Sequence, residues 1–374
     1  MKRKLKIWIA FIFTVAAMFC GMYVYEGLGY MDQRFSANVG NLFESDGQDA
    51  SWFHLPDGRR LGKGLKDFIA GVADNGEAAF YRAMDSVPDI GPRSVGKGNA
   101  SADGVMKIHF IDVEQGDAIL LQQGDACMLV DAGDNDKGTL VCQYLEAAGV
   151  EHLAYICVTH PDADHCGGVD DVLRTYGKTN MLMAQCTNDT ATYDEMIQAI
   201  DDTDSFVEYP SSGDTYHLGD ADIAVLCPEK NAVGAYGDTN DYSIGILVEY
   251  GDISCVMCGD ASERVERDIV YSGIGVEADI LKLGHHGSDT SSCDIFLDAV
   301  SPDYAVISAG RDSVYGHPHK EVMQRMQERN ISIFRTDMQG TVVAITDGKN
   351  LEWNLPVCQD YICGSDLVRD DVGK

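Results

Sequence analysis

The chain has 374 residues, 45% of them hydrophobic, and its 28 basic and 60 acidic side chains give a formal net charge of −32. This length and hydrophobic content fit one large or two ordinary globular domains and exclude a chain that is disordered throughout. The acidic balance excludes binding to nucleic acid or anionic lipid through bulk electrostatics, because such binding draws on Lys and Arg. An anionic substrate would therefore need local cations, which metal ions can supply.

The N-terminus has the pattern of a membrane signal anchor. Four of the first six residues are basic, and an uncharged run from Ile7 to Tyr25 comes after them. As a helix this run reaches roughly 28 Å, near the thickness of a bilayer core. No small-x-small cleavage site is present after the run, so we expect residues 1–25 to be an uncleaved anchor in the cell membrane, the alternative being a cleaved signal peptide and a secreted protein. The basic flank predicts that the rest of the chain is extracellular.

Residues 26–104 differ in amino-acid composition from the rest of the chain. They are rich in Gly, Asp, Asn and Ser, with one amphipathic patch around residues 65–72, and they predict an extracellular spacer that is partly helical or disordered. From residue 105 to residue 356, short apolar strand-like runs alternate with turn residues and helical stretches. We expect this part to be one folded domain and residues 357–374 to be a C-terminal tail.

Two stretches of this domain, 119–133 and 246–260, resemble each other. Each is an apolar strand, a Gly-Asp turn, a second apolar strand and a terminal aspartate, Asp131 or Asp260. Two similar hairpins suggest two related sheets, and the helical stretches between the strand groups suggest helices on both outer faces. The expected architecture is α/β, a four-layer αββα sandwich.

The stretch "THPDADHCGG" (159–168) carries the strongest chemical signal. It places His160, Asp162, Asp164 and His165 within six residues, between an apolar strand and a helical stretch. Imidazole and carboxylate groups are the common ligands of divalent metals, and loops at strand ends let side chains converge. Two histidines and two aspartates within six residues favour a metal site over a solvated acidic turn.

Further ligands must come from elsewhere, because one loop cannot complete the coordination of two ions. Asp260 ends a strand-like run, and its two carboxylate oxygens could bridge two cations. His285 and His286 also come after an apolar run, although one of them could be only a hydrogen bonder. His317 in "GHPH" has the same strand-then-loop position, with a surface histidine as the alternative.

Between about Met106 and Leu355 the chain carries a series of motifs in this order: "FIDVEQGDAILL", "LVDAG", "THPDADHCGG", "NDYSIGILVEYG", "CGDAS", "LKLGHHGSDTSS", "VSPDYAVISAG", "YGHPH" and "FRTDMQGTV". In these motifs and their order the chain resembles a metallo-β-lactamase-fold hydrolase, and in particular the C-terminal extracellular domain of ComEC-type competence proteins. One departure is Glu114, where the family usually has glycine.

The resemblance implies two divalent metal ions, Zn or Mn. The ligands it implies are His160 and Asp162 for the first ion, Asp164, His165 and His285 or His286 for the second, and Asp260 as the bridge. The family's remaining histidine on the first ion falls near Cys227, which would ligate as a thiolate or leave that site weak or oxygen-rich. Because carboxylates replace imidazoles here, Mn²⁺ or Mg²⁺ is also favoured. Asp131 would orient a ligand histidine.

We therefore expect a membrane-anchored, outward-facing metal-dependent hydrolase, a phosphodiesterase or nuclease that uses a metal-activated hydroxide. Its catalytic side chains would be Asp164, His286 and Lys282. The substrate would be a phosphodiester, with single-stranded DNA as the candidate, and no protein partner is inferred. Its expected contacts are Asn240, Asp241, Ser243, Ser288, Arg311 and His317.

Two alternatives to a nuclease stay open. One is a hydrolase of a small phosphoester on a cell-wall polymer, which the acidic composition favours over a long nucleic-acid groove. The other is a non-catalytic binding module with one structural metal, which Cys227 and Glu114 favour. Hydrolysis of β-lactams has no support in the sequence beyond the superfamily's name.

Overall fold

The computed structural model describes residues 104–367, apart from 231, 233, 235 and 312. The predicted anchor at 1–25 and the predicted spacer up to residue 103 lie outside the described residues. Among the residues that are described, no helix combines the length and the apolar character needed to cross a membrane.

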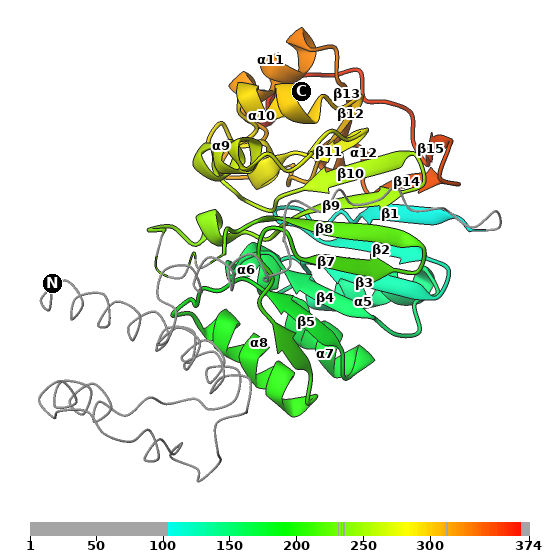
Figure 1. Ribbon diagram of the computed structural model, residues 1–374, viewed down its shortest axis with the longest axis vertical. Coiled ribbons are helices and arrows are strands. Elements are labelled where there is room, and N and C mark those ends of the chain that lie inside the picture. The colour runs from blue at the N-terminus through cyan, green and yellow to red at the C-terminus, as the bar shows by residue number, and fades with distance from the viewer. Residues whose placement is uncertain (1–103, 231, 233, 235, 312, 368–374) are drawn as a thin grey trace, which may run out of the picture. The chain divides into compact units, whose positions relative to one another are not determined.

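Eight strands form the first sheet, in the order β15-β14-β1-β2-β3-β4-β5-β6 (Figure 1). Pairing is antiparallel from β15 to β3 and parallel from β3 to β6. The strands are β1 (Met106–Phe110), β2 (Ile119–Gln123), β3 (Ala126–Val130), β4 (Tyr155–Val158), β5 (Asn180–Met183), β6 (Phe206–Glu208), β14 (Val342–Thr346) and β15 (Leu351–Trp353).

Seven strands form the second sheet, in the order β13-β12-β11-β10-β9-β8-β7. Pairing is antiparallel from β7 to β10 and parallel from β10 to β13. The strands are β7 (Thr215–Leu218), β8 (Ala221–Cys227), β9 (Gly245–Tyr250), β10 (Ile253–Met257), β11 (Ile280–Lys282), β12 (Tyr304–Ile307) and β13 (Ser332–Arg335).

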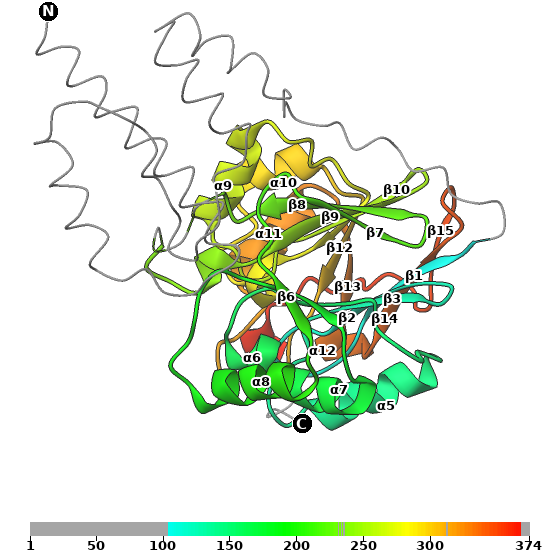
Figure 2. The same cartoon turned by 60° about the horizontal axis from the view of Figure 1, so that its bottom comes forward.

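Helices cover the outer face of each sheet (Figures 1 and 2). On the first sheet they are α5 (Gly138–Ala147), α7 (Val169–Tyr176) and α8 (Ala191–Asp202), and on the second they are α9 (Glu263–Ser272), α10 (Asp294–Val300) and α11 (Lys320–Glu328). Single turns complete the domain: α6 (Ala163–Cys166), η2 (Asn240–Tyr242), η3 (Gly284–Gly287) and α12 (Thr336–Gln339).

Three apolar cores separate these layers. The core between the sheets includes Phe110, Met128 and Ile246. A second core joins the first sheet to its helices, and a third joins the second sheet to its helices. Three cores require four layers, so the αββα sandwich expected from the sequence is confirmed.

The two similar stretches form equivalent hairpins, β2–β3 in the first sheet and β9–β10 in the second. Gly124 and Gly251 occupy the turns with φ of 60° and 65°, a left-handed conformation that glycine adopts without steric cost. Asp131 comes directly after β3, and Asp260 comes shortly after the end of β10 at Met257. The repeat therefore delivers one aspartate from each sheet to the region where loops of the two sheets meet.

Residues 357–367, the described part of the predicted tail, pack against the second sheet and the loop around Pro318. The amide of Cys358 donates to the carbonyl of Ile333 at 2.9 Å, and the amide of Gly364 donates to the carbonyl of Pro318, also at 2.9 Å. Cys358 and Cys363 are both buried with free thiols. The domain therefore extends at least to Leu367.

Candidate metal centre

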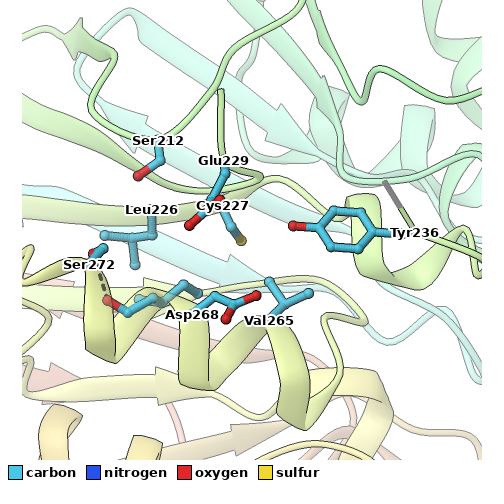
Figure 3. Close-up of a pocket in the computed structure, with 9 residues that line it drawn as sticks. Ser212, Leu226, Cys227, Glu229, Tyr236, Val265, Asp268 and Ser272 are labelled. Carbon is cyan, nitrogen blue, oxygen red and sulfur yellow. Dashed lines mark hydrogen bonds between the residues drawn. The ribbon is translucent and has the colours of Figure 1, made fainter. Parts of the chain in front are cut away.

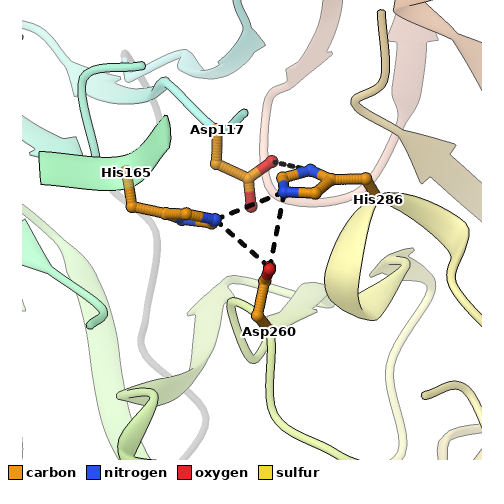
Figure 4. A group of neighbouring side chains, drawn as sticks. All are labelled: Asp117, His165, Asp260 and His286. Atoms are coloured by element: carbon orange, nitrogen blue, oxygen red, sulfur yellow. Dashed lines mark hydrogen bonds and ion pairs between the residues drawn. The ribbon is translucent and has the colours of Figure 1, made fainter. Parts of the chain in front are cut away.

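Four buried side chains converge where loops of both sheets meet (Figure 4). Asp117 precedes β2, His165 lies on α6 after β4, Asp260 lies after β10, and His286 lies on η3 after β11. One ligand atom from each of the four lies within 4.8 Å of all the others. Two imidazoles and two carboxylates at this spacing can hold a divalent cation.

The loop that carries His165 contains a helical turn that the sequence did not predict. The carbonyl of Asp162 accepts the amides of His165 at 3.0 Å and Cys166 at 2.9 Å, which starts α6 directly after the extended Asp162. A side chain at Gly168 would collide with the carbonyl of Ala132. Glycine at this position therefore lets the loop lie against the end of the first sheet.

Asp131 orients His165 from below the cluster. One oxygen of its carboxylate lies 2.8 Å from Nδ1 of His165 and accepts the hydroxyl of Thr159 at 2.7 Å, while the other accepts the amide of Thr159 at 2.8 Å. Nε2 of His165 then faces Oδ1 of Asp260 at 3.3 Å. A histidine held through one nitrogen with the other aimed into the site has the arrangement usual for metal ligands.

His285 and His286 are adjacent residues in the left-handed region, with φ of 49° and 56°. This uncommon backbone lets both side chains approach Asp260, whose Oδ2 lies 3.5 Å from Nε2 of each ring. Nδ1 of His286 lies 3.1 Å from the carbonyl of Ser308, and Nδ1 of His285 lies 3.1 Å from Oγ1 of Thr290. Nε2 of His286 also lies 3.3 Å from Oδ2 of Asp164.

His160 and Asp162 form a second group beside the first. Nε2 of His160 lies 3.7 Å from Oδ2 of Asp162, and the His160 and His165 ring centroids are 4.1 Å apart. The hydroxyl of Thr239 donates to Oδ1 of Asp162 at 2.9 Å, so one oxygen of this carboxylate is already engaged. The predicted ligands other than Cys227 thus all lie in or next to the cluster.

The charges around the cluster favour a cation. Burial by itself lowers the pKa of His286, but the carboxylates of Asp260 and Asp117 raise it to about 10. Burial also lowers the pKa of His165, but the carboxylates of Asp260 and Asp131 outweigh this effect and raise the pKa well above its usual value. His160 differs, because burial lowers its pKa to about 4. Carboxylates that bind protons to two imidazoles this firmly would stabilise a divalent ion in the same place.

Buried polar atoms without a hydrogen-bond partner also favour a bound cation. Among the described residues, His160 Nε2, Asp117 Oδ1 and Asp260 Oδ1 are buried and have no hydrogen-bond partner. Buried polar atoms are nearly always paired, and an unpaired one costs about 1–3 kcal/mol. Cations bound in the cluster and in the adjoining His160–Asp162 group would pair these atoms, so the residues fit the metals that the sequence predicts.

Asp117 is the ligand candidate that sequence reasoning missed. It lies in the motif "FIDVEQGDAILL", where a single polar break separates two apolar runs, and that break was its only signal. Its amide donates to the carbonyl of Asp164 at 3.2 Å. Burial opposes ionisation of Asp117, yet the ammonium of Lys282 and the nearby His286 hold its pKa well below the usual range.

Lys282 lies beneath the cluster and does not face a substrate. Its side chain is 1% exposed, and its Nζ lies 2.8 Å from Oδ2 of Asp117 and 3.0 Å from the carbonyl of Leu283. The sequence placed Lys282 among the catalytic side chains, whereas the structure makes it a counterion for a carboxylate of the cluster.

Cys227 lies outside the cluster. Its thiol points to the outer side of the second sheet, where it lines a small pocket with Tyr236 and Val265 (Figure 3). The thiol donates to the carbonyl of Ser243 at 3.2 Å, and a side chain at Gly245 would collide with it and with Cys258. The backbone of residue 243 thus separates Cys227 from His160.

The predicted substrate contacts are divided between structural and accessible positions. The hydroxyl of Ser243 is buried, accepts the amide of Asp260 at 3.1 Å and lies 3.5 Å from Nδ1 of His160, so it supports the ligands. Asp241 accepts the hydroxyl of Ser262, and Oγ of Ser288 lies 3.0 Å from Oγ1 of Thr290. Asn240 keeps a buried side-chain oxygen without a hydrogen-bond partner in the described chain, and Arg311 is exposed.

His317 adjoins the cluster. Its ring centroid lies 5.6 Å from that of His285 and 6.2 Å from that of His286. Burial, followed by the neighbouring histidines, lowers the pKa of His317 to about 3. Its imidazole is therefore neutral at ordinary pH and lies buried beside the metal ligands.

Comparisons with known proteins agree with this geometry. The model of the metallo-beta-lactamase superfamily matches residues 111–185. ComE operon protein 3 of Bacillus subtilis is 28% identical over 260 residues, which cover 63% of this chain and 32% of that protein. Competence protein ComA of Neisseria gonorrhoeae is 31% identical over 235 residues, which cover 62% of this chain and 31% of that protein. Recombination protein 2 of Haemophilus influenzae is 28% identical over 241 residues, which cover 63% of this chain and 28% of that protein.

Among solved structures, the metallo-beta-lactamase fold protein YhfI from Bacillus subtilis aligns with a TM-score of 0.44 and 14% identity, covering 65% of this chain and all of that one. The chain matches about a third of the length of the curated relatives. The match of residues 111–185 and the two-sheet α/β sandwich support a metallo-β-lactamase fold for the described domain, which carries a candidate metal site. In sequence the chain resembles part of the ComEC-type competence proteins.

Proposed function

We propose that this protein is a metal-dependent phosphodiesterase that cleaves nucleic acid, with single-stranded DNA as the candidate substrate. The observation that carries the proposal is the buried convergence of Asp117, His165, Asp260 and His286 on one point. The relatives are named competence and recombination proteins, and these names direct the choice of substrate to DNA.

The residues divide into a floor and an open side. The side chains of Asp117, Asp260 and Lys282 are 4% exposed or less, so they form the floor. Those of Asp164 and Asp162 are 29% and 34% exposed and lie on the open side, from which a substrate would arrive. Divalent ions held between the two would activate water and neutralise charge on the phosphoryl oxygens.

Asp164 therefore has the position of a catalytic ligand. It is the one predicted catalytic carboxylate that both contacts the buried cluster, at 3.3 Å from Nε2 of His286, and reaches the open side. His286 is fixed by the carbonyl of Ser308 at 3.1 Å, which leaves its Nε2 directed at Asp164 and Asp260. Fixed ligands of this kind hold a reacting group in place without reorganisation during the reaction.

A non-catalytic module with one structural metal is the second candidate. Lys282 already neutralises one carboxylate of the cluster, and Cys227 faces away from His160. The site of the first ion is thus limited to His160, Asp162 and Asp260, and Asp260 is shared with the second ion. A measured content of one metal ion per chain, without hydrolysis of any phosphodiester, would support this candidate over the first.

The test is cleavage of end-labelled single-stranded DNA by the full chain in detergent, with Mn²⁺, with Zn²⁺ or with chelator. We expect metal-dependent cleavage that falls more than about 100-fold in Asp164→Ala, beyond the usual effect of losing an outer partner of a ligand. Asp201→Ala, which removes an exposed aspartate of α8, is the matched control and should cleave normally.

Circular dichroism must show that both variants are folded. Full activity in a folded Asp164→Ala variant would refute the assigned site. Absence of DNA cleavage with either metal, together with metal-dependent hydrolysis of a choline phosphodiester, would replace the nuclease by a hydrolase of small phosphoesters.

Membrane attachment through residues 1–25, with the hydrolase domain outside the cell, is part of the same proposal. Its support is the basic cluster followed by the uncharged run of residues 7–25. The full chain should sediment with membranes and resist extraction at alkaline pH, and deletion of residues 1–25 should release it. Protease added to intact cells should degrade the domain, and protection in that assay would refute the outward orientation.

A further inference from the structure

Two neighbouring apolar side chains lie at the surface just before His317. Val314 is 91% exposed and Tyr315 is 65% exposed. No other large hydrophobic residues of the described chain are both this exposed and adjacent in sequence. Leaving apolar surface in water forgoes stabilisation, and an exposed apolar patch beside a polar site commonly marks a binding position.

The ring of Tyr315 continues the line of imidazoles that leaves the metal cluster. Its centroid lies 5.7 Å from that of His317, and the two ring planes are 22° apart. His317 in turn lies 5.6 Å from His285, whose Nε2 faces Asp260. One face of Tyr315 is thus covered by His317, and its high exposure places the other face in solvent, with the His317 ring between Tyr315 and His285.

Hydrogen bonds from the backbone and from one side chain hold this loop in place. Nε2 of His319 lies 3.1 Å from the carbonyl of Tyr315, and the amide of Gly316 donates to the carbonyl of Ser313 at 3.0 Å. The C-terminal segment supports the adjoining turn through the bond from Gly364 to Pro318. A platform that is already ordered loses little conformational entropy when a ligand binds.

We propose that Tyr315, with Val314 beside it, is a stacking platform for a nucleobase of the substrate next to the cleaved phosphodiester. This inference rests on the proposed function and names the chemistry that the site recognises. Stacking on an aromatic ring needs no basic side chains, which suits a chain of net charge −32. A quaternary ammonium would instead need a cage of several aromatic rings, whereas Tyr315 offers one open face.

The test compares two single-stranded oligonucleotides with the full chain, one with all its bases and one with abasic residues on both sides of the cleaved bond. Tyr315→Ala should lower kcat/KM for the intact oligonucleotide by about 5- to 150-fold, the range for loss of one base–aromatic stack. It should leave kcat/KM for the abasic substrate unchanged. Tyr315→Phe should retain the preference, because the ring is preserved.

Tyr271→Ala is the matched control, because Tyr271 on α9 is 69% exposed and should not affect either substrate. Equal losses on both substrates in Tyr315→Ala, or no loss on either, would overturn the proposal. So would a loss confined to hydrolysis of p-nitrophenyl phosphorylcholine, because that would assign the ring to a cation.

A second readout separates this inference from the proposed function. Binding of an oligonucleotide that contains 2-aminopurine is monitored by fluorescence in the presence of chelator, so that no cleavage is required. Quenching by wild type that disappears in Tyr315→Ala supports the platform even if the protein cleaves no phosphodiester. Unchanged quenching in the variant refutes the platform even if DNA cleavage is found.

Discussion

Replacing Asp131 by asparagine tests whether the cluster depends on an oriented histidine. The carboxylate of Asp131 accepts two bonds from Thr159 and lies 2.8 Å from Nδ1 of His165. Asparagine has the same shape but only one acceptor oxygen, so its amide nitrogen must face one of these donors. Where it faces His165, the ring gives up its Nδ1 proton, and the proton on Nε2 then points into the cluster in place of a lone pair.

The size of the effect can be worked out from these contacts. A hydrogen bond to a charged group contributes about 1.5–3 kcal/mol. Loss of the outer partner of a ligand histidine usually weakens metal binding or activity by about 10- to 100-fold. At about 1.36 kcal/mol per factor of ten, the two figures agree. We therefore expect Asp131→Asn to weaken metal affinity about 10- to 100-fold while the αββα fold is retained.

The assay is competition for Zn²⁺ or Mn²⁺ against a chromophoric chelator, with circular dichroism as the check of folding. Asp125→Asn, at the exposed turn between β2 and β3, removes an aspartate six residues earlier in the chain and is the matched control. A folded Asp131→Asn variant that binds metal within twofold of wild type would refute the argument that His165 is a ligand oriented by Asp131.

Two further predictions concern buried charges outside the ligand set. Lys282→Met should lower the free energy of unfolding by about 3–5 kcal/mol in urea, because it leaves Asp117 buried without its counterion; Lys178→Met, at an exposed ion pair, should have little effect. Burial raises the pKa of Glu266 from 4.5 to about 7, so its ionisation is disfavoured in the folded state. The contribution of protonated Glu266 to the free energy of unfolding is therefore fully present below pH 4.5. It is lost as the pH rises to about 7, by about 3 kcal/mol at most. The decline in stability between about pH 5 and 8 should be smaller in Glu266→Gln than in wild type or in Glu263→Gln, and equal slopes would refute the buried titration.

The parts of the site that come after strands could be predicted from the sequence. Asp164, Asp260 and His286 each lie beyond an apolar run, and in a sandwich such strand ends gather at one edge. The repeated hairpin pattern indicated the two sheets for the same reason, since its Gly-Asp turns and alternating apolar residues are local features.

The remaining parts depend on contacts between distant segments. Asp117 precedes its strand and reaches the cluster only because its amide bonds to the carbonyl of Asp164. Cys227 occupies a position where a histidine is expected, but the local backbone turns its thiol toward Cys258. Lys282 ends an interior strand, so its ammonium meets Asp117 before it can reach a substrate. None of these orientations is encoded in a nearby pattern.

The cluster draws His165 and Asp117 from one sheet and Asp260 and His286 from the other. The layer of apolar side chains between the sheets, with Phe110 and Ile246 among them, therefore acts as the spacer that sets the distance between the two pairs of ligands. Ligand distances in metal sites are expected within about 0.2 Å of their standard values. Volume changes deep in this layer should consequently alter which metal the protein prefers before they unfold it, so that metal selectivity becomes a property of the hydrophobic interior.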